Sequence, residues 1–97
     1  MIRAEIIANQ SIEEDIIELL EIMGIGEAFT YIPHVHGRGR HGRKEASAVW
    51  PEENIIFIIY TEDEQLPVLS AGLESIKDDF KTEGLQCYIT AGLRRLV

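Results

Sequence analysis

All three histidines and four of the nine basic residues of this 97-residue chain stand in one short segment. Residues 34–44 read HVHGRGRHGRK, with three glycines and no acidic residue. The whole chain has a formal net charge of −8, so this segment is a local positive region on an acidic protein. Glycines let backbone N–H groups approach an anion, arginines can grip it, and imidazoles bind metals. The segment is a candidate anion or metal site, and the alternative is a solvated surface loop.

The histidines by themselves predict a metal site. His34 and His36 are two residues apart, so on a regular strand their imidazoles point to the same face, about 7 Å apart. Such a pair can bind one zinc or copper ion, and His41 could complete the set. Further candidate ligands are Glu27, Glu45 and Cys87. The alternative is that the two strand histidines simply titrate near neutral pH.

Length and composition indicate one globular domain, residues 1–97, with 45% hydrophobic and 27% charged residues. The single cysteine, Cys87, excludes an internal disulfide and is typical of a reducing compartment. No apolar run is long enough to span a bilayer, so we expect a cytoplasmic protein without membrane insertion. The acidic balance disfavours nucleic-acid binding, which needs a basic face.

The first half of the chain predicts a strand, a helix and a second strand. Residues 2–8 alternate apolar and polar side chains, which is typical of a strand. Ser11 and Glu14 have the spacing of a capping box that would open a helix, and Gly24 would end it. Residues 28–36 form an extended segment whose proline indicates a sheet edge or a bulge. In a regular strand Phe29, Tyr31, Pro33 and Val35 would share one face, and Thr30, Ile32, His34 and His36 the other.

The second half predicts the same order of elements again. Residues 54–60 read NIIFIIY, an apolar run without alternation, so we expect both faces of this strand to be buried. A helix follows with Pro67 in its first turn. Its apolar stripe consists of Leu66, Leu69, Leu73, Ile76 and Phe80. Residues 85–90 form the last strand, in which Cys87 would point inward.

This β-α-β-β-α-β order predicts an α+β, ferredoxin-like fold with a four-stranded antiparallel sheet and two helices on one face. The cationic segment then connects the second and third strands. A turn of two residues would suffice there, but the connection has more than ten. Long loops on small domains are usually functional or disordered, so this loop is the main candidate for function.

At this point the chain resembles the PII signal-transduction proteins and their PII-like relatives. The resemblance rests on the element order, on a first helix that ends in EIMGI, and on the long connection between the second and third strands. Its most specific part is Val35 to Arg40, VHGRGR, which is similar to the G-x-G-R start of the PII T-loop. The pair Arg94-Arg95 is similar in position to the basic pair near the PII C-terminus.

The resemblance implies a site and a mechanism. Those proteins are trimers that bind nucleotides in clefts between subunits, and their T-loop reports the bound state to a partner protein. This chain would then be a homotrimer that engages a target protein through residues 36–49. A small anionic effector would contact Gly37, Arg38, Gly39 and Arg40 from the loop and Arg94 and Arg95 from the tail.

The chain also departs from PII. Where PII has a phosphate-binding loop rich in glycine and lysine, this chain has only Lys81-Thr82-Glu83-Gly84. The tyrosine that many PII proteins carry for covalent modification is absent between Gly37 and Trp50. We therefore expect a PII-like relative with an effector other than ATP, for which another nucleotide is a candidate, and no uridylylation.

Two other interpretations stay open. A metal-binding protein that uses His34, His36 and His41 would be similar to the CutA-type divalent-cation proteins in its fold and expected trimer. A nucleic-acid-binding module ranks last, because the third strand lacks the exposed aromatic and basic side chains it would need. The sequence contains neither a nucleophile with a base nor paired carboxylates beside a plausible cleft, so we do not expect an enzyme.

Overall fold

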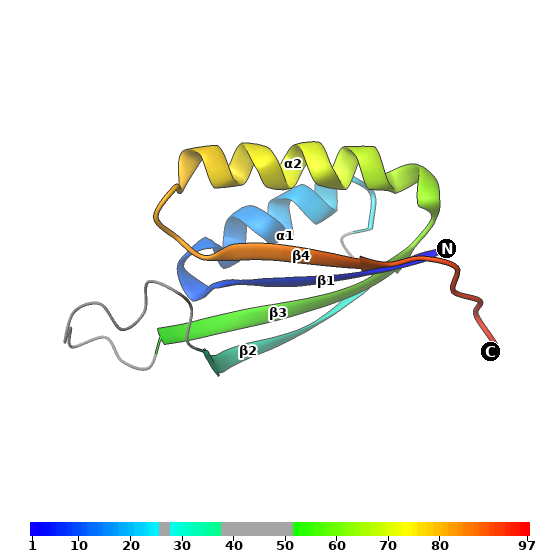
Figure 1. Ribbon diagram of the computed structural model, residues 1–97, viewed down its shortest axis with the longest axis horizontal. Helices are drawn as coiled ribbons and strands as arrows, with labels where there is room; N and C mark the ends of the chain where they lie inside the picture. Colours follow the sequence, from blue (N-terminus) through cyan, green and yellow to red (C-terminus); the bar gives the residue numbers. More distant parts are fainter. Residues whose placement is uncertain (26–27, 38–51) are drawn as a thin grey trace.

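The computed structural model describes residues 1–25, 28–37 and 52–97. The elements are β1 (Ile2–Asn9), a 3-10 turn η1 (Gln10–Ile12), α1 (Glu13–Ile22), β2 (Phe29–Gly37), β3 (Glu52–Thr61), a 3-10 turn η2 (Asp63–Gln65), α2 (Leu66–Asp79) and β4 (Leu85–Thr90). The strands form one antiparallel sheet in the order β2-β3-β1-β4. Both helices cover the same face of the sheet (Figure 1). The predicted ferredoxin-like fold is confirmed.

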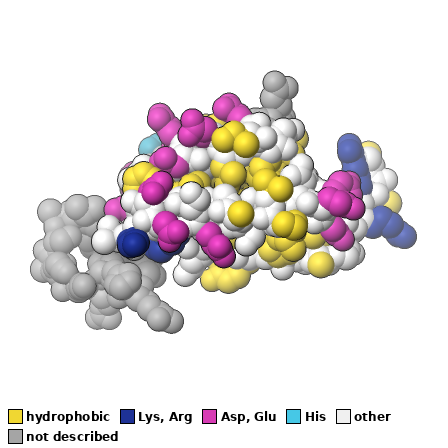
Figure 2. Space-filling view, turned by 90° about the horizontal axis from the view of Figure 1, so that it is seen from above, with side chains coloured by type: hydrophobic (Ala, Val, Ile, Leu, Met, Phe, Trp, Pro, Cys, Tyr) yellow, Lys and Arg dark blue, Asp and Glu magenta, His cyan; other side chains and the backbone are white. Residues whose placement is uncertain are grey.

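The core lies between the sheet and the helix layer. β1 alternates as predicted, with every second side chain buried under the helices. The largest fully buried side chains are Phe57, Ile6, Ile12, Ile16, Leu20, Ile55, Ile59 and Leu69. Burial of each such side chain contributes roughly 1.5–3 kcal/mol relative to exposure. The outer surface of the helix layer, which faces away from the sheet, presents many acidic side chains to solvent (Figure 2).

The first helix begins differently from the prediction. Asn9 Oδ1 accepts a hydrogen bond of 2.9 Å from the backbone N–H of Ser11 and so caps the start of η1. The helix α1 begins only after this turn, at Glu13. Ser11 Oγ instead donates to Glu83 Oε1 at 2.8 Å, so it ties the helix start to the chain segment before β4. The predicted capping box of Ser11 and Glu14 is therefore wrong. The asparagine at the end of β1 makes the turn two residues earlier.

β2 is an edge strand with a bulge, as its proline indicates. Ile32 pairs with Ile56 and Val35 pairs with Asn54, so Pro33 and His34 together occupy the space opposite one β3 residue. The extra residue reverses the alternation beyond the bulge. Val35 therefore shares a face with Ile32, and His36 lies on the helix side opposite Glu53. The predicted division of Val35 and His36 between the two faces is wrong for this reason.

None of the described residues covers the second face of the sheet. On β3 the residues at positions 55, 57, 59 and 61 are buried under the helices, whereas Ile56 and Ile58 are only half-buried. On the same open face, Ile32 is 46% exposed, Tyr60 53% and Tyr88 57%. The helix side of this strand is buried as predicted, and burial of its other side stays a prediction that depends on a further cover.

Among the described residues, no helix combines the length and the apolar character needed to cross a membrane.

Candidate functional site

The loop end of the sheet contains the first of the predicted effector residues. Gly37 is the last residue of β2 and pairs with Glu52. A Cβ at position 37 would lie 2.5 Å from Asn54 Nδ2, so a larger residue there would have to displace the end of the Asn54 side chain. The other loop residues named from the sequence lie outside the described part of the chain: Arg38, Gly39, Arg40 and His41, together with Glu27 and Glu45.

His34 has a specific environment at this same end. Its backbone is in the left-handed region, with φ 58°, and its N–H lies 3.3 Å from Gln10 Oε1, which accepts the hydrogen bond. Its Nδ1 is 3.3 Å from Glu53 Oε1. Gln10 is in turn held because its side-chain amide donates to Glu13 Oε1. The bulge thus connects β2 to β3 and to the start of the helix layer.

The same carboxylate residue, Glu53, lies beside both strand histidines. The predicted 7 Å separation of the two imidazoles assumed a regular strand, which the bulge interrupts. The side chain of Glu53 contacts His34, and Glu53 is the residue of β3 that lies opposite His36. Within the described ranges, no three histidine, cysteine or acidic side chains gather closely enough to hold a metal ion. Cys87 lies on β4, at the opposite edge of the sheet from β2, and so cannot join these histidines within one chain. The metal site stays a prediction that depends on His41.

Cys87 itself has the predicted structural role. It faces Ile6 on β1, packs partly buried against the core, and has a free thiol. Burial raises the pKa of the Cys87 thiol above its ordinary value of 9.0. A thiol in this state is a poor nucleophile at neutral pH.

Arg94 and Arg95, in the C-terminal tail after β4, line a cavity at the other end of the sheet. The cavity has a volume of about 400 Å³ and is lined by Met1, Tyr60, Leu93, Arg94 and Arg95. The backbone N–H of Leu93 donates to the Met1 carbonyl at 3.2 Å, which fastens the tail to the start of β1. A volume of this size is within the range of small-molecule sites.

Arg3 completes a cationic environment around Tyr60. Its guanidinium donates to Tyr60 Oη at 3.0 Å and lies 5.9 Å from the ring centroid. The hydrogen bond to Tyr60 raises the pKa of Arg3 further. The Met1 ammonium lies 3.0 Å from Asp63 Oδ1, and this contact raises the pKa of the amine. Both groups are therefore protonated at neutral pH; Met1 lines the cavity together with Arg94 and Arg95, and Arg3 contacts it through Tyr60.

Tyr60, Met1 and Arg3 were not singled out from the sequence. Tyr60 is only the last residue of an apolar run, and nothing in the sequence around Met1 indicates a site. What brings them together is the register of the sheet, in which Arg3 pairs with Tyr60, and the return of the tail to Met1. The signal that could have found them is the polar tyrosine at the end of an otherwise apolar strand.

The two halves of the predicted effector site lie at opposite ends of one chain. β1 pairs with β3 from Ile2, opposite Thr61, to Asn9, opposite Asn54. Gly37 lies beyond Asn54 and the arginine tail lies beside Met1, as Figure 1 shows for the end of β2 and the C-terminal tail. Seven steps of 3.3 Å along β1 separate these ends by roughly 23 Å. One chain alone cannot bring Gly37 and the arginine pair to one small ligand.

No family model matches the sequence, and no curated protein matches it. Solved structures do match. CPII, a nitrogen regulatory PII-like protein from Thiomonas intermedia K12 bound to ADP, AMP and bicarbonate, has a TM-score of 0.74 at 20% identity over 99% of this chain and 94% of that chain. A putative PII-like signaling protein from Thermus thermophilus has a TM-score of 0.57 at 21% identity, over 92% and 83% of the two chains. The chain has the fold of the PII-like proteins.

The fold does not by itself define the function. The de novo designed protein Foldit4 also matches, with a TM-score of 0.53 at 15% identity over 95% of this chain and 98% of that one. One fold can thus be built for quite different purposes. The function must be argued from the residues at the two ends of the sheet and from the open face.

Proposed function

We propose that this protein is a PII-like regulatory protein that binds a small anionic effector between copies of the chain and signals through residues 36–49 to a partner protein. The observation that carries the proposal is the cavity of Met1, Tyr60, Leu93, Arg94 and Arg95. An aromatic ring beside two guanidinium groups suits a ligand with a flat ring and a phosphate. CPII, which has the same fold, binds ADP and AMP, so adenine nucleotides are the first candidates.

The open face of the sheet supports a homotrimer. Ile32, Ile56, Ile58 and Tyr60 form an exposed, largely apolar surface on the β2 and β3 side of this face, which the described part of a single chain leaves in water. Arg3 and Glu5 of β1 separate it from Tyr88 on β4. Packing of the sheets of neighbouring copies would bury this surface. The same assembly would let the Gly37 end of one copy approach the Arg94-Arg95 tail of another. A site formed by two copies could contain both the Gly37 end and the arginine tail, which lie roughly 23 Å apart within one chain.

The signalling step follows from the location of the loop. An effector that contacts Gly37 and the neighbouring arginines would bind one conformation of residues 36–49 more tightly than the others. Such contacts change the population of the arrangement that the partner recognises. Catalysis is not part of this proposal, because the groups at the cavity are cationic and aromatic groups that suit binding.

Direct binding tests the effector site. We expect ADP or AMP, with and without bicarbonate, to bind wild type in a calorimetric titration. Arg94→Ala/Arg95→Ala should weaken binding by at least roughly 10–100-fold, because the loss of even one charge-assisted hydrogen bond costs about 1.5–3 kcal/mol. Glu74→Ala, which removes an exposed charged side chain on α2 away from the candidate site, is the control and should bind like wild type. Equal affinity of the double arginine variant and wild type would contradict the proposed site.

The same titrations with zinc and copper address the metal interpretation. His34→Ala/His36→Ala should leave nucleotide binding unchanged if the effector is an anion. Tight binding of a metal to wild type that disappears in this double variant would instead favour a metal-binding protein. A ligand that binds only the native state also raises the melting temperature, which gives an independent readout of either result.

A further inference from the structure

The outer surface of the helix layer has an apolar seam between α1 and α2. Leu19 of α1 packs against Gly72 of α2, where a Cβ would overlap the leucine side chain. The glycine therefore allows the two helices to approach closely. The helices run antiparallel, since α1 ends and α2 begins at the same end of the sheet. Gln65 Nε2 donates to the Met23 carbonyl at 3.2 Å and fastens this end.

Two aliphatic side chains are exposed on this seam. Ile22 is 76% exposed and follows Leu19 by three residues, so it lies on the same side of α1, one turn further on. Val68 is 47% exposed and precedes Gly72 by four residues, so it lies on the side of α2 that faces α1. Because the helices are antiparallel, these two steps lead to the same end of the seam. We call Leu19, Ile22 and Val68 the seam patch.

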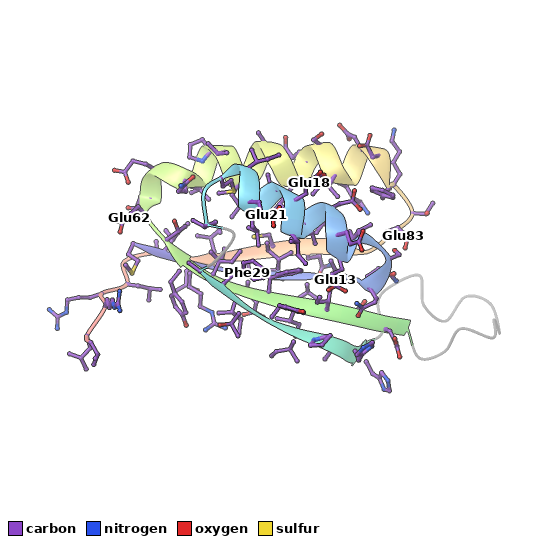
Figure 3. All side chains as sticks on the ribbon, turned by 180° about the vertical axis from the view of Figure 1, so that it is seen from behind. Glu13, Glu18, Glu21, Phe29, Glu62 and Glu83 are labelled. Carbon is purple, nitrogen blue, oxygen red and sulfur yellow. The ribbon has the colours of Figure 1, made fainter. Side chains whose placement is uncertain are left out.

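Acidic side chains border the seam patch. Glu18 and Glu21 are exposed on α1 beside Ile22, and the exposed Glu62 and Glu64 stand in the turn before α2. Figure 3 shows Glu18 and Glu21 on α1 and Glu62 at the end where α2 begins. Figure 2 shows apolar side chains on this surface with acidic ones on both sides. α1 has no basic residue, and the one on α2, Lys77, lies in its last turn, at the far end from Val68.

We propose that the seam patch is a docking surface for a basic segment of a partner protein, in which an aliphatic or aromatic side chain is flanked by lysines or arginines. An apolar centre with a charged rim is the usual anatomy of a protein interface. The acidic rim selects a basic partner and accelerates its encounter with this protein of net charge −8. Anionic lipid and nucleic-acid surfaces would be repelled by the same rim.

This inference goes beyond the effector site. The seam patch is on the helix layer, whereas the open sheet face and the cavity at Tyr60 belong to the other side of the sheet. The surface is present in a single chain without nucleotide. Its test therefore needs neither an effector nor the trimer, and the two proposals can fail independently.

The probe is a synthetic amphipathic helical peptide of leucine and lysine, titrated into the full chain and followed by calorimetry and by backbone amide shifts. We expect binding that weakens with added salt and shifts amides around Ile22 and Val68. Ile22→Ser/Val68→Ser should weaken binding at least about tenfold, as expected for the loss of interface anchors. Both side chains are exposed, so the fold should persist, which the amide spectrum verifies.

Two controls separate docking from general charge attraction. Glu18→Gln/Glu21→Gln should weaken binding, whereas Asp78→Asn/Asp79→Asn, with the same change in net charge at the far end of α2, should not. A leucine and glutamate peptide should not bind. Absence of binding by the basic peptide, an unchanged affinity of the Ile22→Ser/Val68→Ser variant, or equal effects of the two charge variants would each overturn the proposal.

Discussion

His34 shows how one residue determines the geometry of the loop end. It is a non-glycine residue with positive φ, which costs about 1–2 kcal/mol in backbone energy. The bulge that it forms with Pro33 turns His36 toward the helix side and holds β2 against Gln10 and Glu53. Because β2 ends only three residues later, at Gly37, the bulge also sets the direction of the last residues of this strand.

Substitution of His34 tests this strain. His34→Gly should raise the free energy of unfolding by up to about 1 kcal/mol, since glycine adopts positive φ without steric cost and the exposed ion pair with Glu53 contributes little. His34→Val should lower it by about 1–2 kcal/mol, because a β-branched residue disfavours this conformation. Urea denaturation of both variants measures the difference. Equal stability of the two variants would show that the backbone at position 34 is relaxed.

Cys87 gives a prediction for alkaline pH. Burial raises the pKa of its thiol above the ordinary 9.0, so the folded protein holds this proton more tightly than the unfolded chain does. The thiol therefore stabilises the fold fully below the ordinary pKa, and this stability is lost as the pH rises through the folded pKa. As the pH rises above the ordinary value of 9.0, the free energy of unfolding should fall more steeply in wild type than in Cys87→Ala. Parallel pH profiles of the two proteins would contradict the assignment.

At the scale of elements, successive side chains of β3 point alternately to the helix side and to the open face of the sheet. Ile59 is fully buried under the helices, while its neighbour Ile58 is half-buried on the open face. The two positions carry the same side chain in the same central strand. They can therefore report separately on the core and on whatever covers the open face.

Matched substitutions use this difference. Ile59→Val should cost about 0.5–1.5 kcal/mol at any protein concentration, because it removes one buried methylene group from the core. Ile58→Val should have a similar cost only when copies associate, and almost none when the chains are separated by dilution. Chemical denaturation at low and high protein concentration distinguishes the cases. A large effect of Ile58→Val in the dissociated chain would mean that the open face is already packed.

The sequence predicts the elements well and the local geometry less well. The alternation of β1, the bounds of β4 and the proline in the first turn of α2 are confirmed, because each depends on local pattern. The capping box was wrong, because Asn9 competes for the same turn. The faces of Val35 and His36 were wrong, because one bulge residue reverses all later positions. The cavity at Tyr60 was missed, because it arises only from sheet register and the return of the tail.

At the scale of the whole molecule, the open sheet face and the separation of the two groups of candidate effector residues both favour the proposed assembly. Ile58→Glu would place a charge in the proposed contact between copies, and an uncompensated buried charge is strongly unfavourable. Light scattering should give the mass of a trimer for wild type and of a monomer for this variant. The variant should remain folded, because position 58 lies outside the core of the single chain. A monomer mass for wild type would contradict the assembly and the shared site together.

The most direct test of the central claim, a site that two copies complete, is complementation. Arg40→Ala removes an arginine at the loop end, and Arg94→Ala/Arg95→Ala removes those of the tail, so each homotrimer should bind ADP weakly. When the two variants are co-assembled, every mixed trimer contains one cleft that combines an intact loop with an intact tail. We predict that calorimetric titration with ADP then recovers wild-type affinity in that fraction of the sites. Weak binding that persists after co-assembly, with mixed trimers verified by mass, would contradict the account.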